Sequence, residues 1–300
     1  MSIPKALWLS LILTLTGCGE MKENAATAVD SDPGNQFFPK VKGIVQILPT
    51  ADQPTRVIID HEEMEGYMFA MIMPFYVQNL SELNGLEPGS EVTFDFHVKN
   101  YESWIDNVQL TGKKGKIKTT PADWEEDSDT LSPGDVMPDY DFADENGKPV
   151  KLSDYRGMPV AMTFVFARCP VPEYCPKMMR NFNEVREKLE TDPEAPEKFQ
   201  LLTISFDTVN DTPEVLKNWG AAYGHTEEQP WSLLSTPEDA KIREIAGDVG
   251  LKFGTIEGSY IHNLRTVILN PDGTVRKIFT DETWNVDSLI EEMKAAEKQE

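Results

Sequence analysis

The sequence contains few cysteines, few histidines and few basic residues. Three of the 300 residues are cysteine and four are histidine. The 28 lysines and arginines are outnumbered by 51 aspartates and glutamates, which gives a net charge of −23. This balance excludes a basic surface of the kind that nucleic-acid phosphates require, so no nucleic-acid partner is expected. A hydrophobic content of 40% is sufficient for buried cores, and the length favours two domains.

The N-terminal hydrophobic run is too short to cross a bilayer, which takes ~20 residues. The run extends from Ala6 to Thr16, follows Lys5 and ends in the sequence LTGC at Cys18. This ending resembles the bacterial lipobox, in which a peptidase cleaves before a cysteine that becomes lipidated. The resemblance predicts a lipoprotein signal peptide at residues 1–17 and a lipid anchor on Cys18.

A lipid anchor on Cys18 implies a periplasmic location with attachment to a membrane. Gly19, rather than an aspartate, follows this cysteine, which favours the outer membrane over the inner one. Because Cys18 is then consumed by the lipid, Cys169 and Cys175 remain as an isolated thiol pair in an oxidising compartment.

The remainder of the chain shows two different patterns. Residues 18–40 are polar and aperiodic, as expected of a tether. Residues 41–112 contain about five β-rich runs separated by turn residues, which predicts a small all-β barrel of the OB type. Residues 113–132 are charge-biased and are predicted to be a linker. In residues 133–300, strands alternate with helices and lead to a hairpin and a closing helix, which predicts an α/β thioredoxin-like domain.

The first candidate metal site lies in the segment IDHEEMEGYMFAMIMPF. Met71 and Met73 are two positions apart, so on a strand they project from the same face. His61 ends the preceding strand, and Met68 lies on the connection. Thioether sulfur is soft and carries no proton, so this set selects Cu(I) or Ag(I) over Zn, Mg or Ca. The alternative is that the methionines fill gaps in the core of a small barrel.

This segment resembles the CusF-like periplasmic copper-binding domain. The resemblance rests on GIV at 43–45, DHEE at 60–63, GYM at 66–68, AMIMPF at 70–75 and GLEPG at 85–89. It implies that His61, Met71 and Met73 are copper ligands. Met68 stands where the family can hold a tryptophan over the metal, with one residue fewer before it, which suggests a fourth sulfur ligand. Met64 is assigned to the core.

The second candidate site is the cysteine pair. Cys169 and Cys175 lie between an apolar strand-like run at 160–166 and a helix-like run at 177–189, and a helix N-terminus stabilises thiolate. His262 precedes a strand that a thioredoxin-like sheet brings beside the cysteine loop. Two thiolates and an imidazole can bind copper, and a thiolate pair can also cycle to a disulfide. Of the remaining histidines, His97 is expected to be structural or exposed, and His225 is expected to be solvated in a polar loop.

Residues 133–298 resemble the Sco/SenC family of thioredoxin-like copper proteins. The resemblance rests on GDVMPD at 134–139, LSDYRG at 152–157, FVFARCP at 164–170, CP at 175–176, ISFD at 204–207 and DTPEVL at 211–216. His262, eight residues before the NPDG turn at 270–273, fits the family's ligand spacing. The resemblance implies that Cys169, Cys175 and His262 bind the metal and that Asp207 supports them from beside the site.

The cysteine spacing departs from this family. Its usual pattern is C-x3-C, whereas here Cys169 and Cys175 enclose five residues, among them Pro170 and Pro172. This longer loop can still let both sulfurs face one metal, or it can favour disulfide exchange.

The leading hypothesis is a lipid-anchored copper metallochaperone that delivers copper to a cuproenzyme. The resemblance implies the copper centre of a cytochrome oxidase as the recipient, and the covalent linkage of two sites suggests transfer of copper between them. One alternative is a thiol–disulfide oxidoreductase acting through Cys169 and Cys175 on a periplasmic client. Another is a copper-sequestering tolerance protein.

Overall fold

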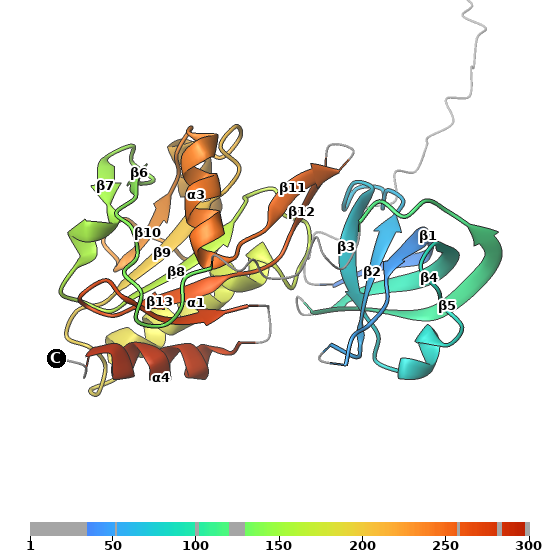
Figure 1. Ribbon diagram of the computed structural model, residues 1–300, viewed down its shortest axis with the longest axis horizontal. Helices are drawn as coiled ribbons and strands as arrows, with labels where there is room; N and C mark the ends of the chain where they lie inside the picture. Colours follow the sequence, from blue (N-terminus) through green and yellow to red (C-terminus); the bar gives the residue numbers. More distant parts are fainter. Residues whose placement is uncertain are drawn as a thin grey trace, which may run out of the picture. The chain divides into compact units, whose positions relative to one another are not determined.

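The computed structural model describes residues 35–51, 53–99, 102–119, 130–256, 259–280 and 284–297 (Figure 1). The predicted signal peptide, Cys18 and most of the predicted tether lie outside these residues, as does the centre of the predicted linker. Within the described ranges, no helix has both the length and the apolar character needed to cross a bilayer.

The first half of the described chain forms a five-stranded antiparallel sheet, which we call the N-terminal sheet. Its strands are β1 (Asn35–Ile47), β2 (Arg56–His61), β3 (Met71–Tyr76), β4 (Ser90–Lys99) and β5 (Glu102–Lys114). They pair in the order β3-β2-β1-β4-β5. A short 3₁₀ helix, η1 (Leu80–Leu83), follows β3. The prediction of a sheet-rich N-terminal region with five strands is therefore confirmed.

Side chains along the strands alternate between buried and more exposed positions, and the buried ones form the core of the N-terminal sheet. On β4, Val92, Phe94, Phe96 and Val98 are buried and the residues between them are more exposed, the period-two pattern of a strand with one covered face. At Gly43, opposite His61 in the β1–β2 register, a Cβ atom would come within 2.3 Å of Ile59 Cγ2. Glycine is therefore required where β1 passes close to β2.

The N-terminal sheet is longer at both ends than expected. β1 begins at Asn35, so residues 35–40 of the predicted tether are strand. β5 continues to Lys114, and the Gln46 side chain holds the following residues by donating to the Lys116 carbonyl and accepting from the Lys118 amide. The first residues of the predicted linker thus belong to this sheet.

The second half of the described chain is built on a five-stranded sheet of order β10-β9-β8-β13-β14. The predicted alternation of strands and helices, with its hairpin and closing helix, is present as β8 (Val160–Val165), α1 (Cys175–Thr191), β9 (Gln200–Ser205), α2 (Pro213–Ala221), α3 (Asp239–Val249), β13 (Thr266–Leu269), β14 (Val275–Phe279) and α4 (Val286–Glu297). Strands β8, β9 and β10 (Trp231–Leu234) are parallel, whereas β13 runs antiparallel to both β8 and β14.

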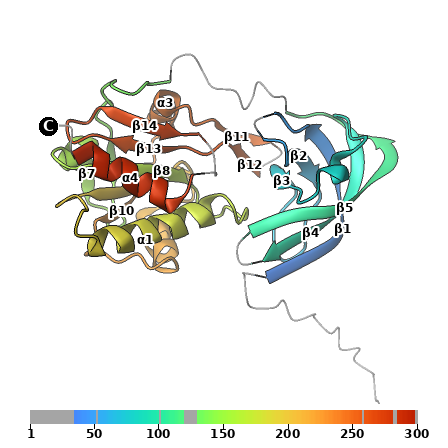
Figure 2. The same cartoon turned by 90° about the horizontal axis from the view of Figure 1, so that it is seen from below.

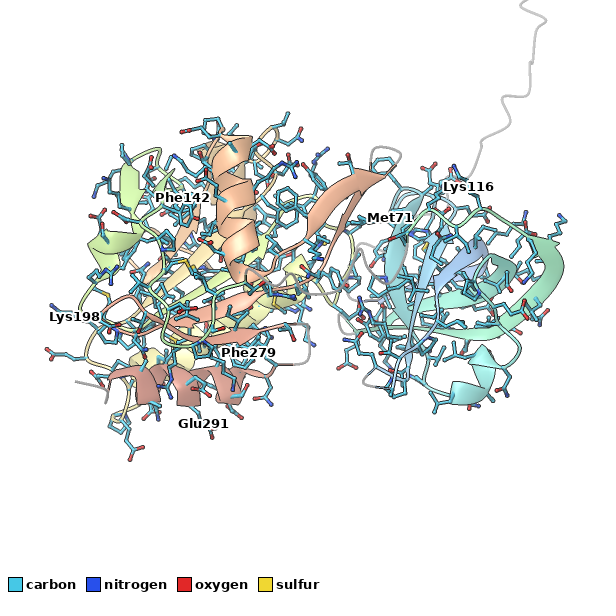
Figure 3. All side chains as sticks on the ribbon, in the orientation of Figure 1. Met71, Lys116, Phe142, Lys198, Phe279 and Glu291 are labelled. Carbon is cyan, nitrogen blue, oxygen red and sulfur yellow. The ribbon has the colours of Figure 1, made fainter. Side chains whose placement is uncertain are left out.

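Helices cover both faces of this second sheet. α1 and α4 pack against each other on one face, and α3 lies on the opposite face (Figures 1 and 2). Leu289 and Met293 of α4 are buried, whereas Glu291 projects away from the sheet (Figure 3). This three-layer α/β arrangement confirms the predicted thioredoxin-like domain.

Several short elements were not predicted. They are β6 (Asp141–Ala143), β7 (Pro149–Lys151), η3 (Leu152–Tyr155), β10, β11 (Phe253–Ile256) and β12 (Ser259–His262). Elements of three or four residues are too short to show a period of their own. The omission of β11 and β12 matters most, because His262 is the last residue of β12.

The expectation that His225 is solvated is wrong. His225 is 6% exposed, its Nε2 lies 2.9 Å from the Trp231 carbonyl oxygen, and its ring packs on the Trp231 indole. His97 is structural as expected, because it stacks on Trp104 and contacts Asp106.

Candidate metal centre

The cysteine loop connects the end of β8 to the start of α1. Phe166 follows β8 and its amide donates to Cys175 Sγ at 3.5 Å, while the Cys169 amide donates to the Phe166 carbonyl. Cys175 is the first residue of α1, and Pro176 in the first turn removes an amide that has no helical partner there. The helix start that the sequence suggested for the second cysteine is thus present.

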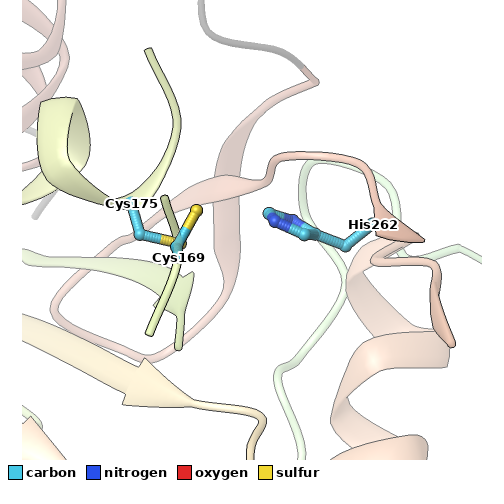
Figure 4. A group of neighbouring side chains, drawn as sticks. All are labelled: Cys169, Cys175 and His262. Carbon is cyan, nitrogen blue, oxygen red and sulfur yellow. The ribbon is translucent and has the colours of Figure 1, made fainter. Parts of the chain in front are cut away.

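His262 faces the two cysteines from β12 (Figure 4). The ligand atoms of Cys169, Cys175 and His262 all lie within 4.8 Å of one another, and all three residues are buried. His262 Nδ1 is 2.9 Å from the Asn263 carbonyl oxygen. A carbonyl only accepts, so Nδ1 carries a proton, and Nε2 is the nitrogen that can bind a metal once it is unprotonated. The two extra residues in the loop therefore leave both sulfurs at one site.

An aromatic enclosure surrounds His262. The rings of Phe166, Tyr174 and Phe206 have centroids 5.5, 5.0 and 5.1 Å from the imidazole. These side chains fix the orientation of the imidazole and limit the access of water. This enclosure was not predicted, because it depends on three residues from separate parts of the chain.

The two thiols have opposite acidities. Burial disfavours the Cys169 thiolate, but hydrogen bonds from Cys175 and His262 outweigh it and lower the pKa of Cys169 to about 5. Burial, followed by the neighbouring Cys169 sulfur, raises the pKa of Cys175 well above its ordinary value. One thiolate and one thiol thus share the site at neutral pH, the arrangement expected of a coupled pair.

Asp207 follows the end of β9 and is fully buried. Its carboxylate accepts hydrogen bonds from Arg168 at 2.9 Å and from the Asn210 side chain. Asp207 therefore acts on the loop through Arg168, the residue before Cys169. A second carboxylate, Asp211, accepts from the Ala167 amide at 2.8 Å and was not predicted.

The His61 and methionine set lies in the N-terminal sheet. His61 ends β2 and pairs with Met71 of β3, and Met68, Met71 and Met73 are all buried. His61 Nδ1 lies 2.6 Å from the Glu62 carbonyl oxygen, while its buried Nε2 has no hydrogen-bond partner among the described residues. In both His61 and His262, Nδ1 is hydrogen-bonded to the carbonyl oxygen of the following residue, so Nε2 is the nitrogen that can bind a metal. Met64 is also buried and bridges to Met68, as expected of a core residue.

We expect the copper-free protein to lose stability in acid through His61. Burial lowers the pKa of His61 from 6.5 to about 4. Between pH 6.5 and about 4 the unfolded chain therefore binds a proton that the folded chain does not. The free energy of unfolding falls by up to about 3 kcal/mol as the pH falls through this range. Urea unfolding at successive pH values measures the loss. In His61→Leu this part of the pH dependence should disappear, and an unchanged profile would contradict the assignment.

Together, the thioredoxin-like fold and the buried cluster define a thiol- and imidazole-bearing α/β protein of the metal-binding or redox class. The SCO1/SenC family model matches residues 128–297. The chain therefore belongs to the SCO1/SenC family.

The proteins similar to this chain include two curated relatives and one solved structure. A protein of Stutzerimonas stutzeri described as copper-binding is 25% identical over 146 residues, which cover 47% of this chain and 67% of the relative. Peroxiredoxin Q of Gentiana triflora is 29% identical over 166 residues, which cover 55% of this chain and 66% of the relative. The chain thus spans about two thirds of these relatives. A structure of BsSco, described as a Sco-family cytochrome c oxidase assembly protein with a disulfide switch, is 24% identical with a TM-score of 0.49, covering 56% of this chain and 98% of that one.

Proposed function

We propose that this protein is a copper metallochaperone that holds Cu(I) at Cys169, Cys175 and His262 and delivers it to a cuproenzyme. The observation that carries the proposal is the convergence of two sulfurs and one imidazole within 4.8 Å in a buried site. Soft thiolate ligands select Cu(I), and burial excludes water that would compete for it. The S. stutzeri relative described as copper-binding supports the same metal.

The proposal includes a second Cu(I) site in the N-terminal sheet. His61, Met71 and Met73 supply its ligands, and Met68 supplies a fourth sulfur. The buried Nε2 of His61, which has no hydrogen-bond partner within the described part of the chain, supports this assignment, because a buried nitrogen without a partner carries a desolvation cost that a metal bond offsets. The strand order and the bridge from Val77 to Ile105, which joins the segment after β3 to β5, support an OB-like, CusF-like barrel.

The cellular setting follows from the N-terminal sequence. Lipidation of Cys18 would hold the chain at a periplasmic membrane surface, with the outer membrane favoured. The recipient that fits the family is the copper centre of a cytochrome oxidase.

A thiol–disulfide oxidoreductase is the second candidate, favoured by the low pKa of Cys169 beside a protonated Cys175. In that reaction the Cys169 thiolate attacks a client disulfide and releases one client thiolate. The Cys175 thiolate, formed by loss of its proton to water, then attacks Cys169 Sγ. This step yields the Cys169–Cys175 disulfide and the reduced client.

His262→Ala separates the two functions. We expect the variant to bind Cu(I) at the cysteine site at least about tenfold more weakly, because one of three ligands is lost. Oxidase assembly in cells that carry the variant should fail while the cysteine pair still cycles between dithiol and disulfide. His225→Gln, which removes the other buried histidine of the domain, is the control. Retained oxidase assembly in His262→Ala would favour the oxidoreductase instead.

A further inference from the structure

The loop between the two cysteines contacts the N-terminal sheet. Glu173, two residues before Cys175, is 8% exposed, and one of its carboxylate oxygens accepts a hydrogen bond from the backbone amide of Ser103 on β5. The other oxygen is buried without a hydrogen-bond partner among the described residues. β12, which carries His262, also packs against β3. A buried carboxylate that bonds a backbone amide 70 positions away is a specific attachment of the loop to the sheet.

Two members of each candidate ligand set line a single small cavity, whereas His61, Met68 and Cys175 are not among its lining residues. Its walls include Met71 and Met73 of β3, Cys169 and Tyr174 of the cysteine loop, and His262 of β12. The cavity has room for about one water-sized sphere, a volume of about 10 Å³. All five of these residues are at most 8% exposed. Two methionines of one site and a cysteine and a histidine of the other thus line one small space that could hold a single ion.

We propose that the cysteine loop, residues 170–174, is a docking element that seals this cavity, and that Cu(I) passes through the cavity from Met71 and Met73 to Cys169 and His262 without entering solution. The proposal rests on the proposed function, because it takes both ligand sets to bind Cu(I). Glu173 is a positioning residue: it holds the loop against β5 and touches no ligand atom of the transferred ion.

The transfer is a ligand exchange without electron transfer. The Cys169 thiolate and His262 Nε2 form bonds to Cu(I) as the thioether bonds from Met71 and Met73 break. Cys175 binds last, and its thiol proton, with any proton on His262 Nε2, passes to water. Copper remains Cu(I) throughout. Neutral thioethers release the ion to an anionic thiolate, so the direction of transfer follows from ligand charge.

The test measures whether a chelator intercepts the copper. The full chain is oxidised so that Cys169 and Cys175 form a disulfide, and one equivalent of Cu(I) is bound at the His61 site. A water-soluble phosphine then reduces the disulfide in the presence of bicinchoninate, a Cu(I) chelator. Ultraviolet absorption reports copper–thiolate formation, and visible absorption reports captured copper. In the unaltered chain we expect little capture, because a cavity with room for one water-sized sphere does not admit the chelator.

Glu173→Ala removes the acceptor for the Ser103 amide. We expect capture by bicinchoninate to rise at least about tenfold, because the advantage of a short, enclosed path is lost. Hydrogen exchange at the Ser103 amide should accelerate in parallel. Glu173→Gln keeps a side-chain carbonyl acceptor and should restore low capture, and Glu228→Ala removes an exposed carboxylate elsewhere without effect.

The outcomes separate the transfer route from the proposed function. Copper stoichiometry of the reduced chain is measured first, and fewer than two bound ions would overturn the proposed function itself. With two ions bound, equal capture in Glu173→Ala and the unaltered chain would overturn the docking route alone. Unchanged exchange at Ser103 in Glu173→Ala would likewise overturn it, since the contact would then be absent in solution.

Discussion

Replacing Cys169 and Cys175 together by serine should lower the Cu(I) bound by the chain from about two ions to about one, because an alcohol is a hard, neutral group with little affinity for Cu(I). In the unaltered protein the low pKa of Cys169 provides a thiolate at neutral pH, and Cys175 loses its proton when the metal binds. The double variant retains neither. Equilibrium dialysis against chelator-buffered Cu(I) measures the stoichiometry, and the copper–thiolate ultraviolet absorption should disappear.

Met179→Leu provides the matched control for this experiment. Met179 is a fully buried sulfur on α1, the helix that begins at Cys175, but it does not belong to the ligand cluster. Leucine is close to methionine in volume, so this variant removes a sulfur with little change in packing. It should bind as much copper as the unaltered chain. Two ions retained in the double serine variant would show that the cysteines are not ligands.

Both the architecture and the rare ligand residues were accessible from sequence because they depend on local pattern. The alternating burial of β4 follows a period that a sequence displays directly, and β8 is a short run that is apolar except for Thr163. With so few cysteines and histidines in the chain, Cys169, Cys175 and His262 were readily selected as a possible cluster.

Other features of the site depend on contacts between distant residues. Phe166, Tyr174 and Phe206 surround His262 only because β8, α1, β9 and β12 meet at one end of the sheet. No local period predicts such a meeting. The hydrogen bond between Glu173 and Ser103 joins residues 70 positions apart in the sequence, so no local pattern could predict it.

Replacing Met71 and Met73 together by leucine should abolish the other copper site. We expect the affinity of the N-terminal sheet for Cu(I) to fall at least about 100-fold, because the branched aliphatic side chain has no lone pair to bind the metal. The fold should persist, since both positions are buried and the volume changes little. Competition with a calibrated Cu(I) chelator measures the affinity, with the cysteine pair blocked as its disulfide so that only the His61 site reports.

Met64→Leu is the control that separates ligand from core. Met64 is as deeply buried as Met71 and Met73, and it forms a β-bridge with Met68. It therefore packs in the core as they do but is not assigned as a copper ligand. It should retain Cu(I) binding. If Met64→Leu lost as much affinity as the Met71 and Met73 double variant, the effect would be one of packing. If the double variant kept its affinity, the methionines of β3 would be core residues, and His61 would have to bind copper with other partners.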